Sequence, residues 1–524
     1  MPPVASAPAF LASSPPQVRA SRWPSGLDWV GLLAVVLLGL FQVAMPFSGD
    51  QALFTVGGRQ LLDGSVFYRD FWDVKQPGIY LFYMAGGVLL GFTEVGIHLF
   101  EVLWNLVFAA GLQRFLRPRL RSARVAALAP LLVQGVYYAA EDLLGMTQLE
   151  ALVGLPLFVV LWACVSTSSG RTARLFLAGI ATGVVVAFKL VYLPLGLVFW
   201  LFPAWDAVRG PRPVRSFLAV AAPLLLGLAI PVGAMLGYVA LHDIGAQTWW
   251  TTVVYPATTT AIEGRPWSRL LLLPPQILDL LGVSVVPAVV GLVLRGRKGI
   301  DRFTVACLAW LGVALPLFAI QHWWSYHVPL FLPPLALLAA RGIDEALARG
   351  MERRSVPAWI AAAALALALV FPLKVLAFKG YNAATFGFGV TQEDRQALQD
   401  RMQTYYVSAR QWARMLSLPD ATPGPVYVIG SPIALYLSGR DQAIPQNGWA
   451  VDQFDGPMWQ RMARQLAAAP PPYLAIRHVS GEFLKERSRE MTDLLARLYC
   501  RDGGSTEDAW YRLRGPKGCQ GDVR

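Results

Sequence analysis

The sequence is poor in charged residues and in the residue types that bind metals. Only 15% of its 524 residues are Asp, Glu, Lys or Arg, whereas soluble domains carry about 25%. It has five histidines and four cysteines, and no His-x-x-x-His, Cys-x-x-Cys or Asp-x-Asp pattern. A glycine-rich loop that would cradle a phosphate is also missing. The sequence therefore indicates no cofactor and does not require a metal ion, and no nucleotide is expected to be handled directly on the outer face.

Long apolar runs take the place of the missing charge. The chain is 55% hydrophobic, its mean hydropathy is +0.46, and several runs approach or reach the length of a membrane span. The net charge of +12 does not indicate nucleic acid, because the basic residues form short clusters between apolar runs, as the positive-inside rule describes. The pattern predicts an α-helical polytopic membrane protein. The clearest runs cover residues 30–44, 151–165, 217–236, 271–294 and 358–371.

The basic clusters set the expected topology. Residues 1–25 are rich in Pro, Ser and Ala and are predicted to be a disordered cytoplasmic N-terminus without a cleavable signal peptide. Residues 79–92 are short for a span, and a full crossing would place the arginine cluster of residues 114–124 outside, so we predict an interfacial or re-entrant helix there. Residues 47–95 then form the first outer loop of a membrane domain covering residues 26–379. The membrane domain is predicted to have about eleven spans and at most thirteen. The eleven cover residues 27–46, before the loop, and 96–116, 123–140, 148–165, 175–188, 190–203, 217–241, 270–294, 303–320, 326–340 and 357–376, after it.

The composition changes after residue 380, and residues 380–524 are predicted to form a small extracytoplasmic α/β domain over the first outer loop. Helical patterns cover residues 392–416 and 482–498, and short apolar runs typical of buried strands cover residues 426–430, 473–476 and 510–513. Cys164 and Cys307 lie in apolar runs and are expected to pack there. Cys500 and Cys519 lie in the polar tail, and outside the cytoplasm they are candidates for a disulfide.

The first outer loop concentrates ionisable residues, which are functional candidates by default near a bilayer. A carboxylate just after a span can take a proton from an incoming hydroxyl, so Asp50 is a candidate general base. The alternative is that Asp50 caps the helix that follows Ser48 and Gly49, and both roles can hold together. Lys75 is a candidate for binding a phosphate, with an ordinary snorkelling lysine as the alternative.

Several Lys and Arg residues are expected on the outer side of the membrane, against the positive-inside rule. A bound phosphate would explain their position. Glu150 and Lys189 should lie at the same depth, either as a simple ion pair or as parts of a polar cavity. Residues 321–327 form an aromatic and histidine cluster, which either anchors the helices at the interface or binds sugar or phosphate through His322 and His327. The outer cations before residue 380 are Arg59, Arg69, Lys75, Lys189, Arg265, Arg269, Lys374 and Lys379.

Several short motifs occur in a fixed order along the chain. They are Gly49-Asp50-Gln51, Leu61-Leu62-Asp63-Gly64, Tyr68-Arg69-Asp70-Phe71, Lys75-x-Pro77, Thr147-Gln148-Leu149-Glu150, Ala187-Phe188-Lys189 and the Tyr326-His327-x-x-Pro motif that opens residues 326–340.

In this order the segments resemble the polyprenyl-phosphate-dependent membrane glycosyltransferases of the type C fold (GT-C), which include the protein O-mannosyltransferases and the lipid A aminoarabinose transferases. The resemblance covers essentially the whole chain, with departures at Gln51 and Gln76, where relatives often carry Glu and Pro. It implies inverting transfer of a sugar from a polyprenyl-phosphate donor to a hydroxyl, with Asp50 as the base. The donor phosphate would be held by Lys75, Lys189, Arg265, His327 and Tyr326, and the acceptor or sugar would contact Glu150, Arg59, Tyr68, Asp73 and His322.

This interpretation places the protein in a bacterial inner membrane, with a cytoplasmic N-terminus and a periplasmic C-terminal domain. Its expected partners are the lipid-linked donor, membrane lipids, and a glycolipid, polysaccharide or protein acceptor, but no nucleic acid. The sequence does not specify the sugar, the lipid chain or the acceptor. A transporter or flippase for lipid-linked saccharides, or a non-catalytic assembly factor, remains the alternative. Transporters more often show internal repeats and broken helices at mid-membrane, which the sequence does not show.

Overall fold

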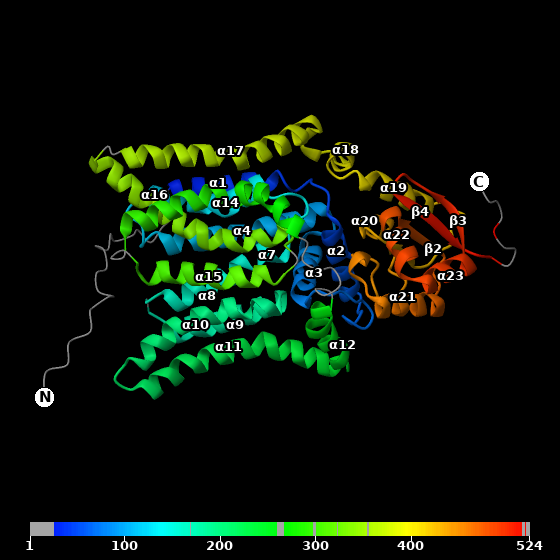
Figure 1. Cartoon of the computed structure of the whole chain (residues 1–524), viewed down its shortest axis with the longest axis horizontal. Coiled ribbons are helices and arrows are strands. Elements are labelled where there is room, and N and C mark those ends of the chain that lie inside the picture. The colour runs from blue at the N-terminus through cyan, green and yellow to red at the C-terminus, as the bar shows by residue number, and fades with distance from the viewer. Residues whose placement is uncertain are drawn as a thin grey trace.

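The computed structural model describes residues 26–167, 169–258, 267–296, 300–321, 323–353, 356–515 and 519. Two sites predicted from the sequence, Arg265 and His322, and the segment of residues 1–25 lie outside the described residues. Long helices lie side by side in one bundle, and a small domain containing all four strands adjoins one end of it (Figure 1).

The helical membrane fold agrees with the sequence. Within the described residues, eight helices are long and apolar enough to cross a membrane, and each overlaps one of the predicted spans. The overlap is smallest for the last, which covers Leu365–Thr385 where residues 357–376 were predicted. Of the other three, residues 27–46 and 148–165 contain shorter apolar helices, and residues 326–340 begin as a 3-10 helix. The bundle elements are α1 (Gly26–Leu40), α4 (Glu94–Leu116), α5 (Ala123–Leu128), η1 (Ala129–Leu132), α6 (Gln134–Ala140), α7 (Leu149–Leu152), α8 (Gly154–Val165), α9 (Arg171–Phe188), η2 (Leu190–Tyr192), α10 (Leu193–Val208), α11 (Pro213–Leu241), α12 (Gly245–Trp249), η3 (Trp250–Val254), α14 (Trp267–Arg295), α15 (Arg302–Ala319), η5 (Ser325–Phe331), α16 (Leu332–Arg353) and α17 (Val356–Thr385).

Two short helices of the first outer loop, α2 (Gly49–Leu62) and α3 (Pro77–Leu90), lie at the end of the bundle that faces the strand domain (Figure 1). The 14 residues of α3 span roughly 21 Å at 1.5 Å per residue, less than the ~30 Å hydrocarbon core. This length fits the predicted interfacial or re-entrant helix. Both helices begin with residues suited to a helix start, since Ser48 and Gln51 form a capping box and Pro77 occupies the first turn.

The C-terminal domain is the predicted α/β unit, with a four-stranded sheet in the order β1-β2-β4-β3. Strands β1 and β2 are parallel, and the other pairs are antiparallel. The strands are β1 (Val426–Ile429), β2 (Tyr473–Arg477), β3 (Tyr499–Gly504) and β4 (Asp508–Leu513), and the helices are η6 (Gly387–Gly389), α18 (Gln392–Met402), α19 (Tyr405–Leu416), α20 (Ile433–Ser438), η7 (Val451–Gln453), α21 (Gly456–Ala468), α22 (His478–Arg487) and α23 (Arg489–Leu498).

The helical patterns of this domain were each expected to be continuous, but each is divided in the structure. Residues 392–416 break at the extended residue Gln403, and residues 482–498 break at Ser488, whose side chain accepts a hydrogen bond from the amide of Met491. A serine that caps a new helix stabilises a restart of this kind. The structure also adds β3, which was not predicted because its Arg-Asp-Gly-Gly sequence is more typical of a turn.

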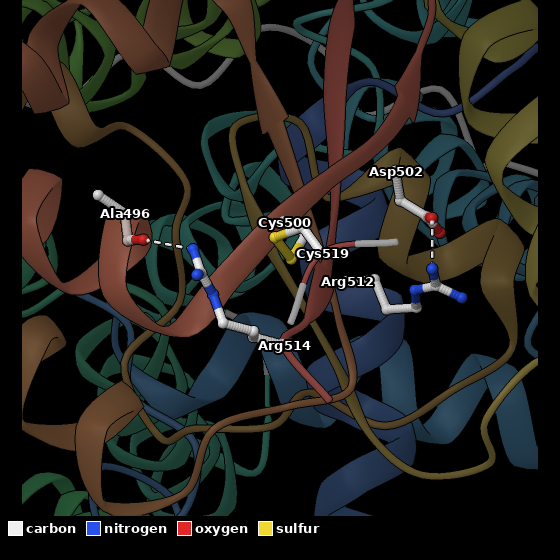
Figure 2. The surroundings of a disulfide bond; sticks show 6 residues. All are labelled: Ala496, Cys500, Asp502, Arg512, Arg514 and Cys519. Carbon is white, nitrogen blue, oxygen red and sulfur yellow. Dashed lines mark hydrogen bonds and ion pairs between the residues drawn. A yellow bond between two sulfur atoms is a disulfide. The ribbon is translucent and has the colours of Figure 1, made fainter. Parts of the chain in front are cut away.

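Cys500 and Cys519 form a disulfide, with their Cα atoms 5.5 Å apart. Figure 2 shows the bond beside β3 and β4, where Arg512 forms an ion pair with Asp502 at 3.4 Å and Arg514 donates to the carbonyl of Ala496 at 3.0 Å. The disulfide joins Cys519 to the edge strand β3, and the ion pair joins β4 to the same strand.

We expect alkylation of the denatured, unreduced protein to label Cys164 and Cys307 only, because the other two cysteines are joined. Reduction before alkylation should make Cys500 and Cys519 reactive as well. Mass spectrometry of the alkylated peptides measures this directly. Labelling of Cys500 and Cys519 without reduction would contradict the pairing.

Candidate active site

Asp50 lies in the first turn of α2, but it is not the cap of that helix. The N-cap is Ser48, whose backbone amide donates to Oε1 of Gln51 at 2.6 Å. The Gln51 amide in turn donates to the carbonyl of Met146 at 2.7 Å. The capping role considered for Asp50 is therefore wrong, and its carboxylate makes contacts with more distant parts of the chain.

Asp50 is 5% exposed, and its carboxylate contacts side chains from three separate segments of the chain. Trp449 of the C-terminal domain donates its indole N–H to Oδ1 at 2.6 Å, and Gln148 donates to Oδ2 at 3.1 Å. Lys75 Nζ lies 3.3 Å from Oδ1. Three donors from distant parts of the chain therefore fix the position of one carboxylate at the end of the bundle.

Lys75 does not extend into solvent as a snorkelling lysine would. Its side chain is 17% exposed, and its ammonium also lies 5.0 Å from the ring of Phe54. Burial lowers the pKa of Lys75, but the charges of Asp50 and then Asp73 offset this effect, and the pKa is raised above its ordinary value. The ammonium therefore stays charged and can interact with an anion.

Tyr68 and Asp73 support the loop around Lys75. The Tyr68 hydroxyl donates to the carbonyl of Lys75 at 3.0 Å, and the Tyr80 hydroxyl donates to Oδ2 of Asp73 at 2.6 Å. Tyr68 has a φ of 69°, which is uncommon for a bulky residue. Burial, with a further effect of Asp73, raises the pKa of Tyr68, so the phenol is neutral and acts as a donor.

A second cluster surrounds Glu150, which is 1% exposed. Its Oε1 lies 2.8 Å from Lys189 Nζ, 3.1 Å from the Tyr192 hydroxyl and 3.6 Å from Nε2 of His327. Lys189 also donates to Oε1 of Gln321 at 2.6 Å. The ion pair that the sequence suggested between Glu150 and Lys189 is therefore present, within a larger polar group.

The two clusters adjoin each other. Gln148, which binds Asp50, and Glu150 lie two residues apart at the start of α7. The charge of Glu150 also contributes to the raised pKa of Lys75. Two carboxylates and two ammonium groups, from α2, α7 and the ends of two loops, thus lie within electrostatic range of one another.

Of the other predicted residues, Arg59 lies outside these clusters and Tyr326 lies beside the second one. Arg59 is near the far end of α2, where its guanidinium lies 3.8 Å from Asp441 of the C-terminal domain. Tyr326 packs between Trp324 and His327, with ring centroids 6.3 Å and 4.6 Å away. Over the part of the chain that the structure describes, no group of three or more His, Cys, Asp or Glu residues could hold a metal ion.

Sequence reasoning missed Trp449 and a buried support beneath the site, and it placed Gln148 in a motif without giving it a role. Glu101, which is fully buried in α4, accepts hydrogen bonds from the amide of Thr147 at 3.1 Å and from its hydroxyl at 3.0 Å. Thr147 has a φ of 53°, a strained value for a β-branched residue. This turn directs the chain toward Gln148. An ionisable residue in the middle of the apolar residues 96–116 was a signal for Glu101, whereas Trp449 had none.

A close approach at Gly49 gives a test of the Trp449 contact. A Cβ on Gly49 would lie 2.6 Å from the Trp449 ring. We therefore expect Gly49→Ala to lower the free energy of unfolding by about 1–3 kcal/mol, a typical cost of overpacking, and to displace the indole from Asp50. Gly237→Ala in α11 is the matched control, because a Cβ there meets nothing within 4 Å. Denaturant titration of the solubilised protein measures both, and equal effects would contradict the tight contact.

Comparison with known proteins supports the fold. No protein-family model matches the sequence, and no curated protein matches it. The structure is similar to ArnT from Cupriavidus metallidurans in the apo state, with a TM-score of 0.56 and 15% identity over 92% of this chain and 97% of that chain. This likeness shows that the chain has the ArnT fold, which is the expected GT-C fold.

Two further structures are similar at lower scores. One is the same protein bound to undecaprenyl phosphate, with a TM-score of 0.49 and 13% identity over 95% of this chain and 100% of that chain. The other is the archaeal oligosaccharyltransferase AglB from Archaeoglobus fulgidus, in complex with an inhibitory peptide and a dolichol-phosphate. Its TM-score is 0.48 and its identity 12%, over 96% of this chain and 75% of that chain.

Proposed function

We propose that this chain is a membrane glycosyltransferase that moves a sugar from a polyprenyl-phosphate donor to a hydroxyl acceptor, with inversion at the anomeric carbon. The observation that carries the proposal is the buried Asp50 carboxylate, held by Trp449, Gln148 and Lys75 at the domain-facing end of the bundle. The ArnT fold is consistent with this chemistry. The sugar and the acceptor are outside the proposal.

The proposed reaction begins with the acceptor hydroxyl beside Asp50. As the acceptor oxygen bonds to the anomeric carbon, its proton passes to the Asp50 carboxylate, and the bond from that carbon to the phosphate oxygen breaks on the opposite face. The polyprenyl phosphate leaves with the bonding electron pair. Positive groups fixed where this charge develops would stabilise the transition state.

Lys75, Lys189 and His327 are the proposed phosphate-binding groups. In the structure Lys75 and Lys189 are paired with Asp50 and Glu150. Arrival of the donor phosphate would therefore draw an ammonium away from its carboxylate, and Asp50 would become a better base only when the donor is present. The site would sit at the outer face of a bacterial inner membrane, beneath a periplasmic C-terminal domain.

Reconstitution in proteoliposomes with a radiolabelled polyprenyl-phosphate sugar and an extract of envelope acceptors tests the proposal. A glycosyltransferase removes the label from the lipid and leaves polyprenyl phosphate, which thin-layer chromatography resolves. If the label stays on the lipid while the lipid changes leaflet, the protein is a flippase. If neither occurs, an assembly factor without catalysis is favoured.

A further inference from the structure

A cavity of about 240 Å³ lies between the membrane domain and the C-terminal domain, beside the loop that carries Lys75. Its lining includes Tyr68 and Trp72 of the first outer loop, Trp250 of η3, and Arg461 of α21. The volume is below the ~300–1,000 Å³ of pockets for drug-sized ligands, so it suits a single sugar unit better than an extended chain.

Aromatic rings form one side of the cavity. The rings of Trp72 and Trp250 lie 6.0 Å apart, and Tyr255 packs behind both, with centroids 5.5 Å and 5.1 Å away. Trp72 is fixed by its indole N–H, which donates to the hydroxyl of the buried Thr251 at 2.9 Å. Trp72 is buried and Trp250 is half-buried, and rigid indoles offer apolar faces for the C–H side of a sugar ring at little entropic cost.

Arg461 brings a positive charge to the same cavity. Its guanidinium lies 4.4 Å from the Trp250 ring, and within the described residues no carboxylate lies within ion-pair distance of it. Burial, and then the charge of Arg464, lower the pKa of Arg461, and the charge of Asp455 offsets part of this effect. A guanidinium binds carboxylate or phosphate with two parallel hydrogen bonds, so Arg461 can hold an anion that enters the cavity.

The cavity is also close to the proposed transfer site. Trp72 precedes Lys75 by three residues, so their Cα atoms are at most roughly 11 Å apart. The backbone of Trp72 is clamped by the C-terminal domain, through its amide to Pro445 at 2.8 Å and its carbonyl to Asn447 at 2.7 Å. Trp449, two residues further on, binds Asp50. One segment therefore positions both the cavity wall and the base.

We propose that this cavity binds an anionic sugar unit of the acceptor, with Trp72 and Trp250 against the ring and Arg461 on its carboxylate or phosphate. The inference rests on the proposed function for the identity of the ligand as acceptor. The residues themselves select for a saccharide that carries a negative charge. Gln247, which also lines the cavity, supplies an amide for a sugar hydroxyl.

Saturation-transfer NMR on the detergent-solubilised full chain tests the site with three probes: glucose 1-phosphate, glucuronate and glucose. We expect both anionic probes to bind at least about tenfold more tightly than glucose. Arg461→Gln should remove this preference, and Arg461→Lys should retain part of it, because the charge remains. Trp250→Leu should weaken all three probes. Whichever of the two anionic probes binds more tightly shows whether the cavity prefers a phosphate or a carboxylate.

Arg464→Gln is the matched control, because Arg464 is an exposed arginine on the same helix that does not line the cavity. It should bind all probes as the wild type does. The inference would be overturned if the wild type and Arg461→Gln both bound the three probes with equal affinity. It would also be overturned if Arg464→Gln lost the preference for anionic probes as fully as Arg461→Gln does. In the wild type, absence of transfer with intact probe binding counts against the proposed function alone, and transfer without probe binding counts against the cavity alone. Asp50→Asn should bind the probes as the wild type does, because Asp50 does not line the cavity.

Discussion

Replacement of Asp50 by asparagine is expected to lower the rate of sugar transfer by about 10²–10⁴-fold, the usual contribution of a general base. Asparagine keeps the shape of the side chain, and its carbonyl can still accept from the Trp449 indole, which lies 2.6 Å from Oδ1 in the wild type. It cannot take the proton of the acceptor. Donor binding should persist, because Lys75 and Lys189 remain. Single-turnover assays with bound donor measure the chemical step.

Asp70→Asn is the matched control for this experiment. Asp70 belongs to the same loop, but its carboxylate pairs with Arg69 at the surface, where their side chains are 40% and 51% exposed. Surface pairs contribute about 0–1 kcal/mol, so this variant should transfer at nearly the wild-type rate. An unchanged rate in Asp50→Asn, with the protein folded and the donor bound, would contradict the assignment of the base.

Removal of one member of the Glu150–Lys189 pair is expected to lower the free energy of unfolding by about 3–5 kcal/mol, because an uncompensated charge is left in a buried site. The carboxylate of Glu150 is fully buried, and the two charges are 2.8 Å apart. Glu150→Gln and Lys189→Met should each show this loss. The double variant should recover most of the stability, yet it should still bind polyprenyl phosphate more weakly, because Lys189 is a proposed phosphate ligand.

An exposed pair in the C-terminal domain provides the comparison. Arg489 and Asp493 lie 3.7 Å apart, one turn apart on α23, and their side chains are 96% and 72% exposed. Asp493→Asn should cost only about 0.3–0.5 kcal/mol. Denaturant titrations of all variants give the coupling energy by a double-mutant cycle. If the changes in free energy of unfolding caused by Glu150→Gln and Lys189→Met were strictly additive in the double variant, the two charges would not stabilise each other.

Much of the site is predictable because charge is conspicuous in an apolar sequence. Asp50 and Lys75 stand out in the first outer loop, and Glu150 and Lys189 stand out at the ends of apolar runs, so depth alone suggested their pairing. The membrane fold follows for the same reason, since apolar length is a strong signal.

Contacts between distant segments were not predictable in this way. Trp449 reaches Asp50 across 399 residues of sequence, and no local pattern distinguishes it from other tryptophans at an interface. Glu101 and the left-handed Thr147 define the turn before Gln148 only once α4 and the start of α7 are packed together. The break at Ser488 has a local signal in the capping serine, whereas the helical periodicity of residues 392–416 gives no sign of the break at Gln403.

A structure of the protein with bound polyprenyl phosphate, determined by electron cryomicroscopy, tests the central claim most directly. That claim is that Asp50 and the ammonium groups of Lys75 and Lys189 serve one transfer site. We predict that the phosphate lies within hydrogen-bond distance, about 3 Å, of at least one of these ammonium groups, and that the Lys75–Asp50 pair at 3.3 Å opens. A phosphate bound away from both lysines, with the Lys75–Asp50 pair intact, would contradict the account.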